Sequence, residues 1–70
     1  MKNNILPLAA MENLLKIKAN APRVSNSAKE ELRNILEDYA EKIGEMAVKL
    51  AAHSKRKTVT GEDIRLAAKS

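Results

Sequence analysis

The fold is decided by residues 32–50, which read LRNILEDYAEKIGEMAVKL. Their apolar side chains recur at intervals of three and four residues: Leu32, Ile35, Leu36, Tyr39, Ile43, Met46, Ala47 and Leu50. This spacing predicts a long amphipathic helix, because it places these side chains along one face. A helix of about 28 residues is about 40 Å long. The rest of a 70-residue chain is too small to cover such a stripe, so the pattern predicts that a second chain covers it.

The long helix has two candidate starting points. Ser25 or Ser27 can cap its first turn, and Ser27 with Glu30 three residues later fits a capping box. Gly44 lies in the helix interior, where glycine costs about 1 kcal/mol relative to alanine. A close backbone crossing at that point would be a reason for the glycine.

Two shorter helices are expected on either side of the long one. The first covers residues 7–18, because Pro7 suits the first turn of a helix and apolar residues follow at helical spacing. It ends before Pro22, since the residue preceding a proline is disfavoured in helical geometry. The third helix begins at Thr60, which can cap it together with Asp63. The order is short, long, short, and the predicted class is all-α.

The composition favours one small domain, residues 1–70, with residues 1–5 expected to be disordered. Cysteine is absent and Tyr39 is the single aromatic residue, so oligomerisation is the stabilising device that remains. His53 has no partner spaced for metal binding, so neither a metal nor a cofactor is expected. No apolar run approaches the about 20 residues of a membrane span, and the start is too short for a secretory signal. A soluble intracellular protein is therefore expected.

Catalysis finds little support in the sequence. Glu37, Asp38 and Glu41 are close together but lie among other charged residues, which favours a solvated helix face. With two glycines the chain has no glycine-rich phosphate loop, and its serines lack an evident base. The sequence therefore predicts a protein that is not an enzyme.

The positive charge is concentrated at the two ends of the chain. Residues 1–23 carry four basic side chains against one acidic, and residues 55–70 carry five against two. Residues 24–54 carry four basic side chains against six acidic. This distribution suits a polyanion held at loops and ends rather than along the middle of the chain.

The strongest basic cluster is Lys55-Arg56-Lys57-Thr58, just ahead of the third helix. By itself such a cluster is more often a solubilising turn than a binding site. However, Arg23 lies in the other connector, likewise just before a helix start, and helix N-termini favour phosphate. Aromatic stacking partners are missing, which argues against single strands, and no basic face runs along a recognition helix. The sequence therefore predicts that these loops bind duplex DNA through its phosphates.

Four motifs give the chain a specific resemblance to a known family, the archaeal histones, from about residue 6 to residue 69. They are Leu6-Pro7-Leu8-Ala9, Arg23-Val24-Ser25, the tract from His53 to Val59, and Glu62-Asp63-Ile64. The resemblance implies a histone fold and an intertwined handshake dimer, in which the long helices of two chains cross. The core of this dimer would be formed by Leu32, Leu36, Tyr39, Ile43 and Met46.

The resemblance also implies the residues that contact DNA. Arg23 would enter the minor groove, steadied by Thr58 of the partner chain, with Lys57 on phosphate. Lys16 would make a further backbone contact, and the helix start at Ser25 would offer N–H groups. Lys55 is an additional charge of this chain at the same loop.

Two further roles follow from the resemblance, each with an open alternative. Arg56 would pair with Asp63 and lock the loop to the third helix, or else contact DNA directly. Leu50, His53 and Asp63 would join one dimer to the next, with His53 against the carboxylate. The alternative for His53 is an exposed histidine at a helix end, favoured by the helix dipole.

The chain departs from the family pattern at several positions. Asn13 stands where an arginine is usual, Ala52 replaces a basic residue, and Lys55 replaces a glycine. The first loop is expected to be one residue longer, with its usual glycine replaced around Ala19-Asn20. These changes bear on how closely successive turns of bound DNA can stack.

Three functions compete at this stage. The leading one is an architectural protein that bends and wraps double-stranded DNA largely without sequence specificity, as a homodimer able to form tetramers or polymers, alone or mixed with paralogous histones. It would lie in the cytoplasm on the chromosome (nucleoid). The alternatives are a histone-fold subunit of a heterodimeric, sequence-specific transcription regulator, and a helical adaptor without a nucleic-acid role.

Overall fold

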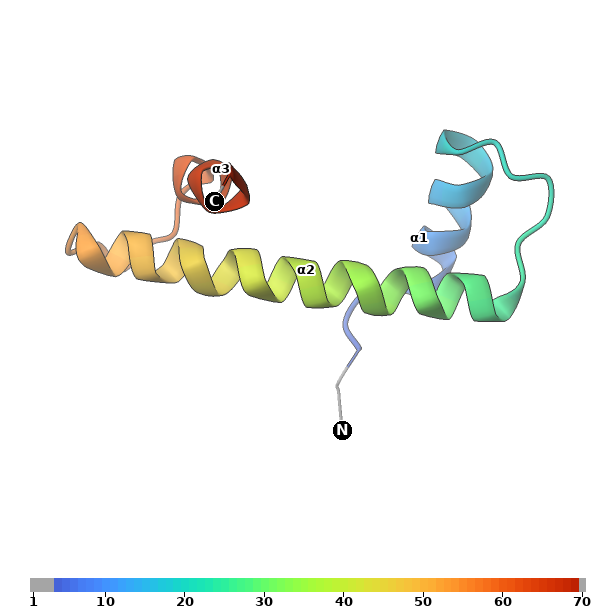
Figure 1. Cartoon of the computed structure of the whole chain (residues 1–70), viewed down its shortest axis with the longest axis horizontal. Helices are drawn as coiled ribbons and strands as arrows, with labels where there is room; N and C mark the ends of the chain where they lie inside the picture. Colours follow the sequence, from blue (N-terminus) through green and yellow to red (C-terminus); the bar gives the residue numbers. More distant parts are fainter. Residues whose placement is uncertain (1–3, 70) are drawn as a thin grey trace. The chain divides into compact units, whose positions relative to one another are not determined.

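The computed structural model describes residues 4–69, and all its regular elements are helical (Figure 1). They are α1 (Leu8–Asn13), the π-helix η1 (Leu14–Lys18), α2 (Asn26–His53) and α3 (Gly61–Lys69). Residues 4–69 contain no strand. The predicted short, long, short order of helices is confirmed. The chain forms two compact units, Met1–Asp38 and Tyr39–Ser70, which we describe in turn.

In the first unit, the initial helix changes character halfway along its length. Its start follows Pro7, which is extended and provides no side-chain cap. Its second half, η1, is a π-helix, and a π turn takes up more residues than an α turn. Asn20 follows at φ 62°, a left-handed conformation that asparagine tolerates better than most residues.

The start of α2 is fixed by Ser25. The Oγ atom of Ser25 accepts a hydrogen bond from the N–H of Ala28 at 3.1 Å, so Ser25 is the capping residue. Ser27 already lies in the first turn, with its hydroxyl 3.1 Å from that of Ser25. The predicted capping box of Ser27 and Glu30 is therefore wrong, because the residue three positions after the true cap is alanine.

The segment before α1 is held against α2. The N–H groups of Ile5 and Leu6 both donate to Glu37 Oε2, at 2.6 and 2.7 Å. The side-chain amide of Asn4, with its NH₂ turned toward the carboxylate, donates to Glu37 Oε1 (2.7 Å) and accepts from Arg33 Nη2 (3.0 Å). Of the segment 1–5 that we expected to be disordered, residues 1–3 lie outside the described residues.

In the second unit, α2 ends in a Schellman motif. The N–H of Arg56 donates to the carbonyl of Ala51 and the N–H of Lys55 to that of Ala52, both at 2.9 Å. Lys55, two residues after the last residue of α2, occupies the left-handed position of this motif, with φ 60°. This is the left-handed conformation that glycine adopts without penalty and that lysine rarely adopts.

The start of α3 is capped reciprocally. The N–H of Thr60 donates to Asp63 Oδ2 at 2.9 Å, and the N–H of Asp63 lies 3.4 Å from Thr60 Oγ1. The sequence predicted this pair from the three-residue spacing, and the structure confirms it.

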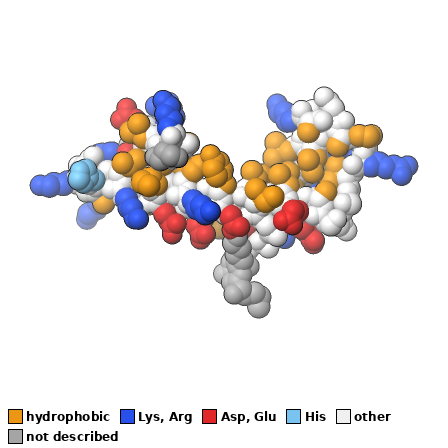
Figure 2. All heavy atoms as spheres, in the orientation of Figure 1, with side chains coloured by type: hydrophobic (Ala, Val, Ile, Leu, Met, Phe, Trp, Pro, Cys, Tyr) orange, Lys and Arg blue, Asp and Glu red, His pale blue; other side chains and the backbone are white. Residues whose placement is uncertain are grey.

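Few apolar side chains are buried. Met11 is buried in the first unit, and Ala47, Ala51 and Ala67 are buried in the second. Of the large residues of the stripe, Ile35, Tyr39 and Met46 are exposed in the single chain, and the others are half-buried. Figure 2 shows apolar side chains along one side of α2 and carboxylates along the opposite side. The amphipathic pattern is confirmed, and its apolar face is only partly covered in the single chain.

Candidate nucleic-acid interface

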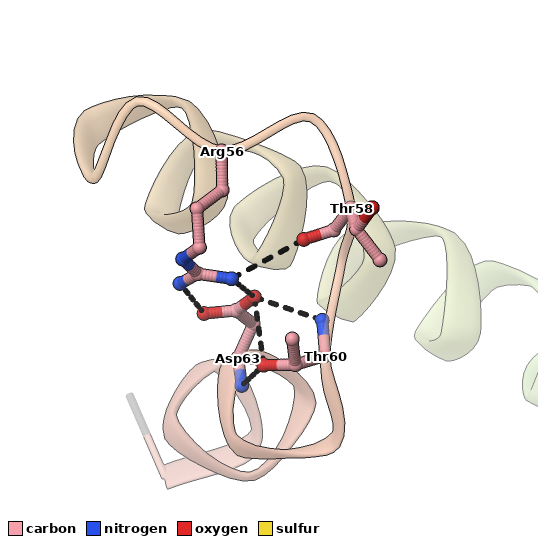
Figure 3. Close-up of polar contacts among 4 residues, drawn as sticks. All are labelled: Arg56, Thr58, Thr60 and Asp63. Carbon is pink, nitrogen blue, oxygen red and sulfur yellow. Dashed lines mark hydrogen bonds and ion pairs between the residues drawn. The ribbon is translucent and has the colours of Figure 1, made fainter.

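Loop 2, residues 54–60, is organised by Arg56 and Asp63 (Figure 3). Arg56 Nη2 donates to Asp63 Oδ1 at 2.9 Å, and Nη1 donates to Oδ2 at 3.0 Å. The same Nη1 also donates to the carbonyl of Thr58 at 3.2 Å. A bidentate arginine–carboxylate pair is among the stronger hydrogen-bonded contacts in proteins. The pair is the one that the resemblance implies, and it ties loop 2 to α3.

The carboxylate of Asp63 is enclosed and accepts four hydrogen bonds. Besides Arg56 it accepts from the N–H and the hydroxyl of Thr60, and the residue is only 2% exposed. The hydrogen bonds from the Arg56 guanidinium, followed by the bond from the Thr60 N–H, hold the pKa of Asp63 well below its ordinary value, against the effect of burial. The hydrogen bond to Asp63 likewise raises the pKa of Arg56. Because the residue is buried, its carboxylate offers little exposed surface to an approaching histidine.

Within the basic cluster, Arg56 is bound to Asp63, whereas the two lysines are not paired with an acid in the part of the chain that the structure describes. Lys55 and Lys57 are exposed, and neither has a carboxylate within ion-pair distance among residues 4–69. Thr58 is also exposed, with its carbonyl engaged by Arg56. The charges that loop 2 offers to a ligand are therefore the two lysines.

Loop 1, residues 19–25, presents Arg23. Its side chain is exposed, and within the described part of the chain it forms no ion pair. Two residues later Ser25 caps α2, and the first turn of that helix contains no acidic residue. Apart from the N–H of Ala28, the first N–H groups of that turn have no intrahelical partner, so the positive end of the helix is available to an anion.

The start of α3 differs from the start of α2. Its first turn contains Glu62 and Asp63, and the N–H groups of Thr60 and Asp63 are already bound. At this helix start the carboxylate of Asp63 occupies the position beside the Thr60 N–H, and the two acidic side chains oppose the approach of a phosphate. The helix start beside Arg23 remains the better anion site.

Among residues 4–69, Lys16 is the one predicted DNA contact that is paired with an acid. Its Nζ lies 2.8 Å from Glu12 Oε2, and Lys29 Nζ lies 3.6 Å from Glu12 Oε1. The hydrogen bond from Lys16, with its positive charge, lowers the pKa of Glu12. The i,i+4 spacing of Glu12 and Lys16 is the sequence signal that could have found this pair. The approach of Lys29 depends on the packing of helices and had no sequence signal.

The predicted dimer residues lie on α2, and none is buried in the single chain: Leu32, Leu36, Tyr39, Ile43 and Met46. Of the residues expected to join dimers, Leu50 is half-buried and His53 is the exposed last residue of α2. Asp63 is the buried partner of Arg56.

Residues 4–69 contain no group of three or more His, Cys, Asp and Glu side chains placed to hold a metal ion. None of the helices in the described chain is long and apolar enough to cross a membrane.

A long amphipathic helix between two short ones, with a basic loop before and after it, is the arrangement of the histone class of helical proteins. A family model described as "Histone-like transcription factor (CBF/NF-Y) and archaeal histone" matches residues 4–68. The chain belongs to this family.

Two curated relatives are archaeal histones by name. The first is one of the subunits of the archaeal histone HAN1 of Thermococcus zilligii. It is 46% identical over 65 residues, which cover 93% of this chain and 96% of the relative. The second, "Probable archaeal histone 3" of Methanocaldococcus jannaschii, is 45% identical over 62 residues, covering 89% and 91% respectively. The similarity thus extends over nearly the whole of each chain.

Proposed function

We propose that the protein is an architectural chromatin protein that binds, bends and wraps double-stranded DNA as a dimer, largely without sequence specificity. The observation that carries the proposal is the pairing pattern of its basic loops. Arg23, Lys55 and Lys57 have no acidic partner among residues 4–69, whereas Arg56 of the same cluster is engaged internally. The unpaired charges lie in the loops that flank the uncovered long helix.

The dimer follows from the exposed stripe of α2. Burying a large apolar side chain contributes about 1.5–3 kcal/mol, so a stripe with Tyr39, Ile35 and Met46 exposed strongly favours a partner. Nothing lies within 4 Å of a Cβ built on Gly44, so the helix backbone can be approached closely there. A second copy crossing near this glycine in a handshake would cover the stripe.

The dimer would combine the two loops. In the handshake arrangement loop 1 of one chain lies beside loop 2 of its partner. Arg23 would then enter the minor groove, steadied by Thr58 of the partner chain, and Lys57 would contact phosphate together with Lys55. The N–H groups of the turn after Ser25 would bind a further phosphate. Affinity would come from phosphate neutralisation and DNA bending, with little reading of bases.

The salt dependence of binding to unrelated duplexes tests this function. We expect log K to fall linearly and steeply with log salt, and the affinities for duplexes of different sequence to be similar. A flat salt response would contradict the proposal. In the cell the protein would lie on the chromosome, in the cytoplasm. Contacts through Leu50 and His53 would extend dimers into tetramers or longer arrays, alone or mixed with paralogous histones.

A second candidate is a histone-fold subunit of a heterodimeric, sequence-specific transcription regulator. The family description names histone-like transcription factors beside archaeal histones, and one relative is named as a subunit. A strong preference for one duplex, appearing only with a different partner chain, would favour this candidate. A homodimer with equal affinity for unrelated duplexes would count against it.

A further inference from the structure

The first unit contains a small charge cluster in which Glu12 of α1 lies between two lysines. Glu12 Oε2 is 2.8 Å from Lys16 Nζ of η1, and Oε1 is 3.6 Å from Lys29 Nζ of α2. Both carboxylate oxygens are therefore engaged, each by a different helix. The family resemblance implies a DNA contact for Lys16, and it implies no role for Glu12 or Lys29.

Lys29 keeps the carboxylate in place. The side chain of Lys29 is only 16% exposed, and it lies in the first turn of α2, where the helix dipole disfavours positive charge. Glu12 compensates that charge. The carboxylate is thus a fixed part of the contact between α1 and α2, and its other oxygen holds Lys16, whose side chain is 46% exposed.

We propose that Glu12 lowers the affinity of the protein for DNA by competing with phosphate for Lys16. This inference rests on the proposed function. A phosphate that approaches Lys16 either displaces Glu12 from it or binds with a fixed carboxylate a few ångströms away, and like charges at that distance repel. In either case Lys16 contributes less than an unpaired lysine such as Lys57. The positive charge of Lys16 is therefore only partly available to DNA.

The test is a double-mutant cycle on the full chain, with binding to one mixed-sequence duplex measured by fluorescence anisotropy at several salt concentrations. Because an exposed ion pair is weak and each dimer has two copies, we expect Glu12→Gln to tighten binding about three- to tenfold. The plot of log K against log salt should become steeper by about one to two. Lys16→Gln should weaken binding less in the wild-type background than in the Glu12→Gln background, where it should abolish the gain.

The matched control is Glu41→Gln on the exposed, acidic side of α2, which changes the net charge by the same amount. We expect it to shift affinity much less than Glu12→Gln. Because Glu12→Gln also removes a partner from Lys29, sizing and thermal unfolding accompany each measurement. If that variant does not form the dimer, Glu12→Gln/Lys29→Gln compared with Lys29→Gln alone makes the same test with the buried charge removed.

The proposal is overturned if an intact Glu12→Gln dimer binds no more tightly than the wild type, or if the gain persists without Lys16. An equal gain from Glu41→Gln would also overturn it, since net charge alone would then explain the effect. Failure of the proposed function looks different, because the wild-type chain itself would show no salt-dependent binding to duplex DNA.

Discussion

At the scale of single residues, Lys55 combines an unfavourable backbone conformation with an exposed charge. It occupies the left-handed position of the Schellman motif, at φ 60°, where the family pattern has glycine. We expect Lys55→Gly to raise the free energy of unfolding by about 0.5–1 kcal/mol. Chemical denaturation at fixed protein concentration measures this, since dimer stability depends on concentration.

The same substitution should weaken DNA binding. Lys55→Gln is the control, because it removes the charge and keeps a side chain in the left-handed conformation. We expect both variants to lose affinity and only the glycine variant to gain stability. Equal stabilities of the two would show that the backbone conformation of Lys55 carries no strain.

Asp63 makes the stability of the protein dependent on pH. Its pKa in the folded chain is held below the ordinary value of 3.8, chiefly by the Arg56 guanidinium. A depressed carboxyl pKa stabilises the fold above the ordinary value, and this contribution is lost as the pH falls from there toward the folded pKa. We expect Asp63→Asn to lower the unfolding midpoint at pH 7 and to flatten the acid limb of the stability curve below about pH 4.

Thermal unfolding across pH 2–7 measures the effect. Glu62→Gln, on the neighbouring and exposed position of α3, is the control and should retain the acid limb of the wild type. An Asp63→Asn curve parallel to the wild-type curve at every pH would contradict the role given to this carboxylate.

Residue roles could be predicted from the sequence where spacing along the chain decides them. The cap formed by Thr60 and Asp63 needs only a three-residue interval, and it is present. The pairing of Arg56 with Asp63 followed from the family pattern. The choice of Ser25 over Ser27, and the position of Lys29 against Glu12, depend on where helices begin and how they pack. Periodicity does not specify either.

At the scale of elements, the two loops beside α2 carry the predicted DNA contacts. Because each dimer has two copies, Arg23→Ala or Lys57→Ala should each make the salt dependence shallower by about two and weaken binding on the order of tenfold or more. The dimer should stay folded, since both side chains are exposed. Anisotropy titrations with sizing check both expectations.

Lys42→Ala is the matched control for these loop variants, an exposed lysine of α2 outside both loops. We expect it to change the salt dependence little. If Lys42→Ala and Lys57→Ala weakened binding equally, the loops would have no special part in holding DNA.

Element order followed from the sequence because each helix has a clear apolar period and a residue that marks its start. The π-helix η1 could not be predicted in the same way. A helix can widen by one residue per turn without a change in the apolar pattern of the sequence. Phosphate binding at the start of α3 stays a prediction, and the Asp63 that predicts the cap places a carboxylate there.

At the scale of the whole molecule, we expect folding and dimerisation to be one process. Tyr39 is 57% exposed in the single chain, so a polar residue there would be harmless to a monomer. In the proposed handshake dimer the same position would lie in the core. We expect Tyr39→Asp to abolish the dimer, most of the helical structure and DNA binding together, as measured by sizing and circular dichroism.

Ile17→Asp is the comparison for Tyr39→Asp. Ile17 is 68% exposed and lies on η1, outside the apolar stripe of α2, so the substitution should be tolerated. A Tyr39→Asp protein that remained helical, dimeric and able to bind DNA would show that the stripe is not the dimer interface. The need for a partner could be predicted from stripe length alone, whereas the angle at which two chains cross could not.

Digestion by nuclease of DNA saturated with the protein tests the central claim most directly. If dimers wrap DNA side by side, each should cover about three minor-groove turns of about 10 base pairs, and protected fragments should form a ladder with steps of about 30 base pairs. Protection confined to one short fragment, with no regular ladder, or no protection at all, would contradict an architectural role.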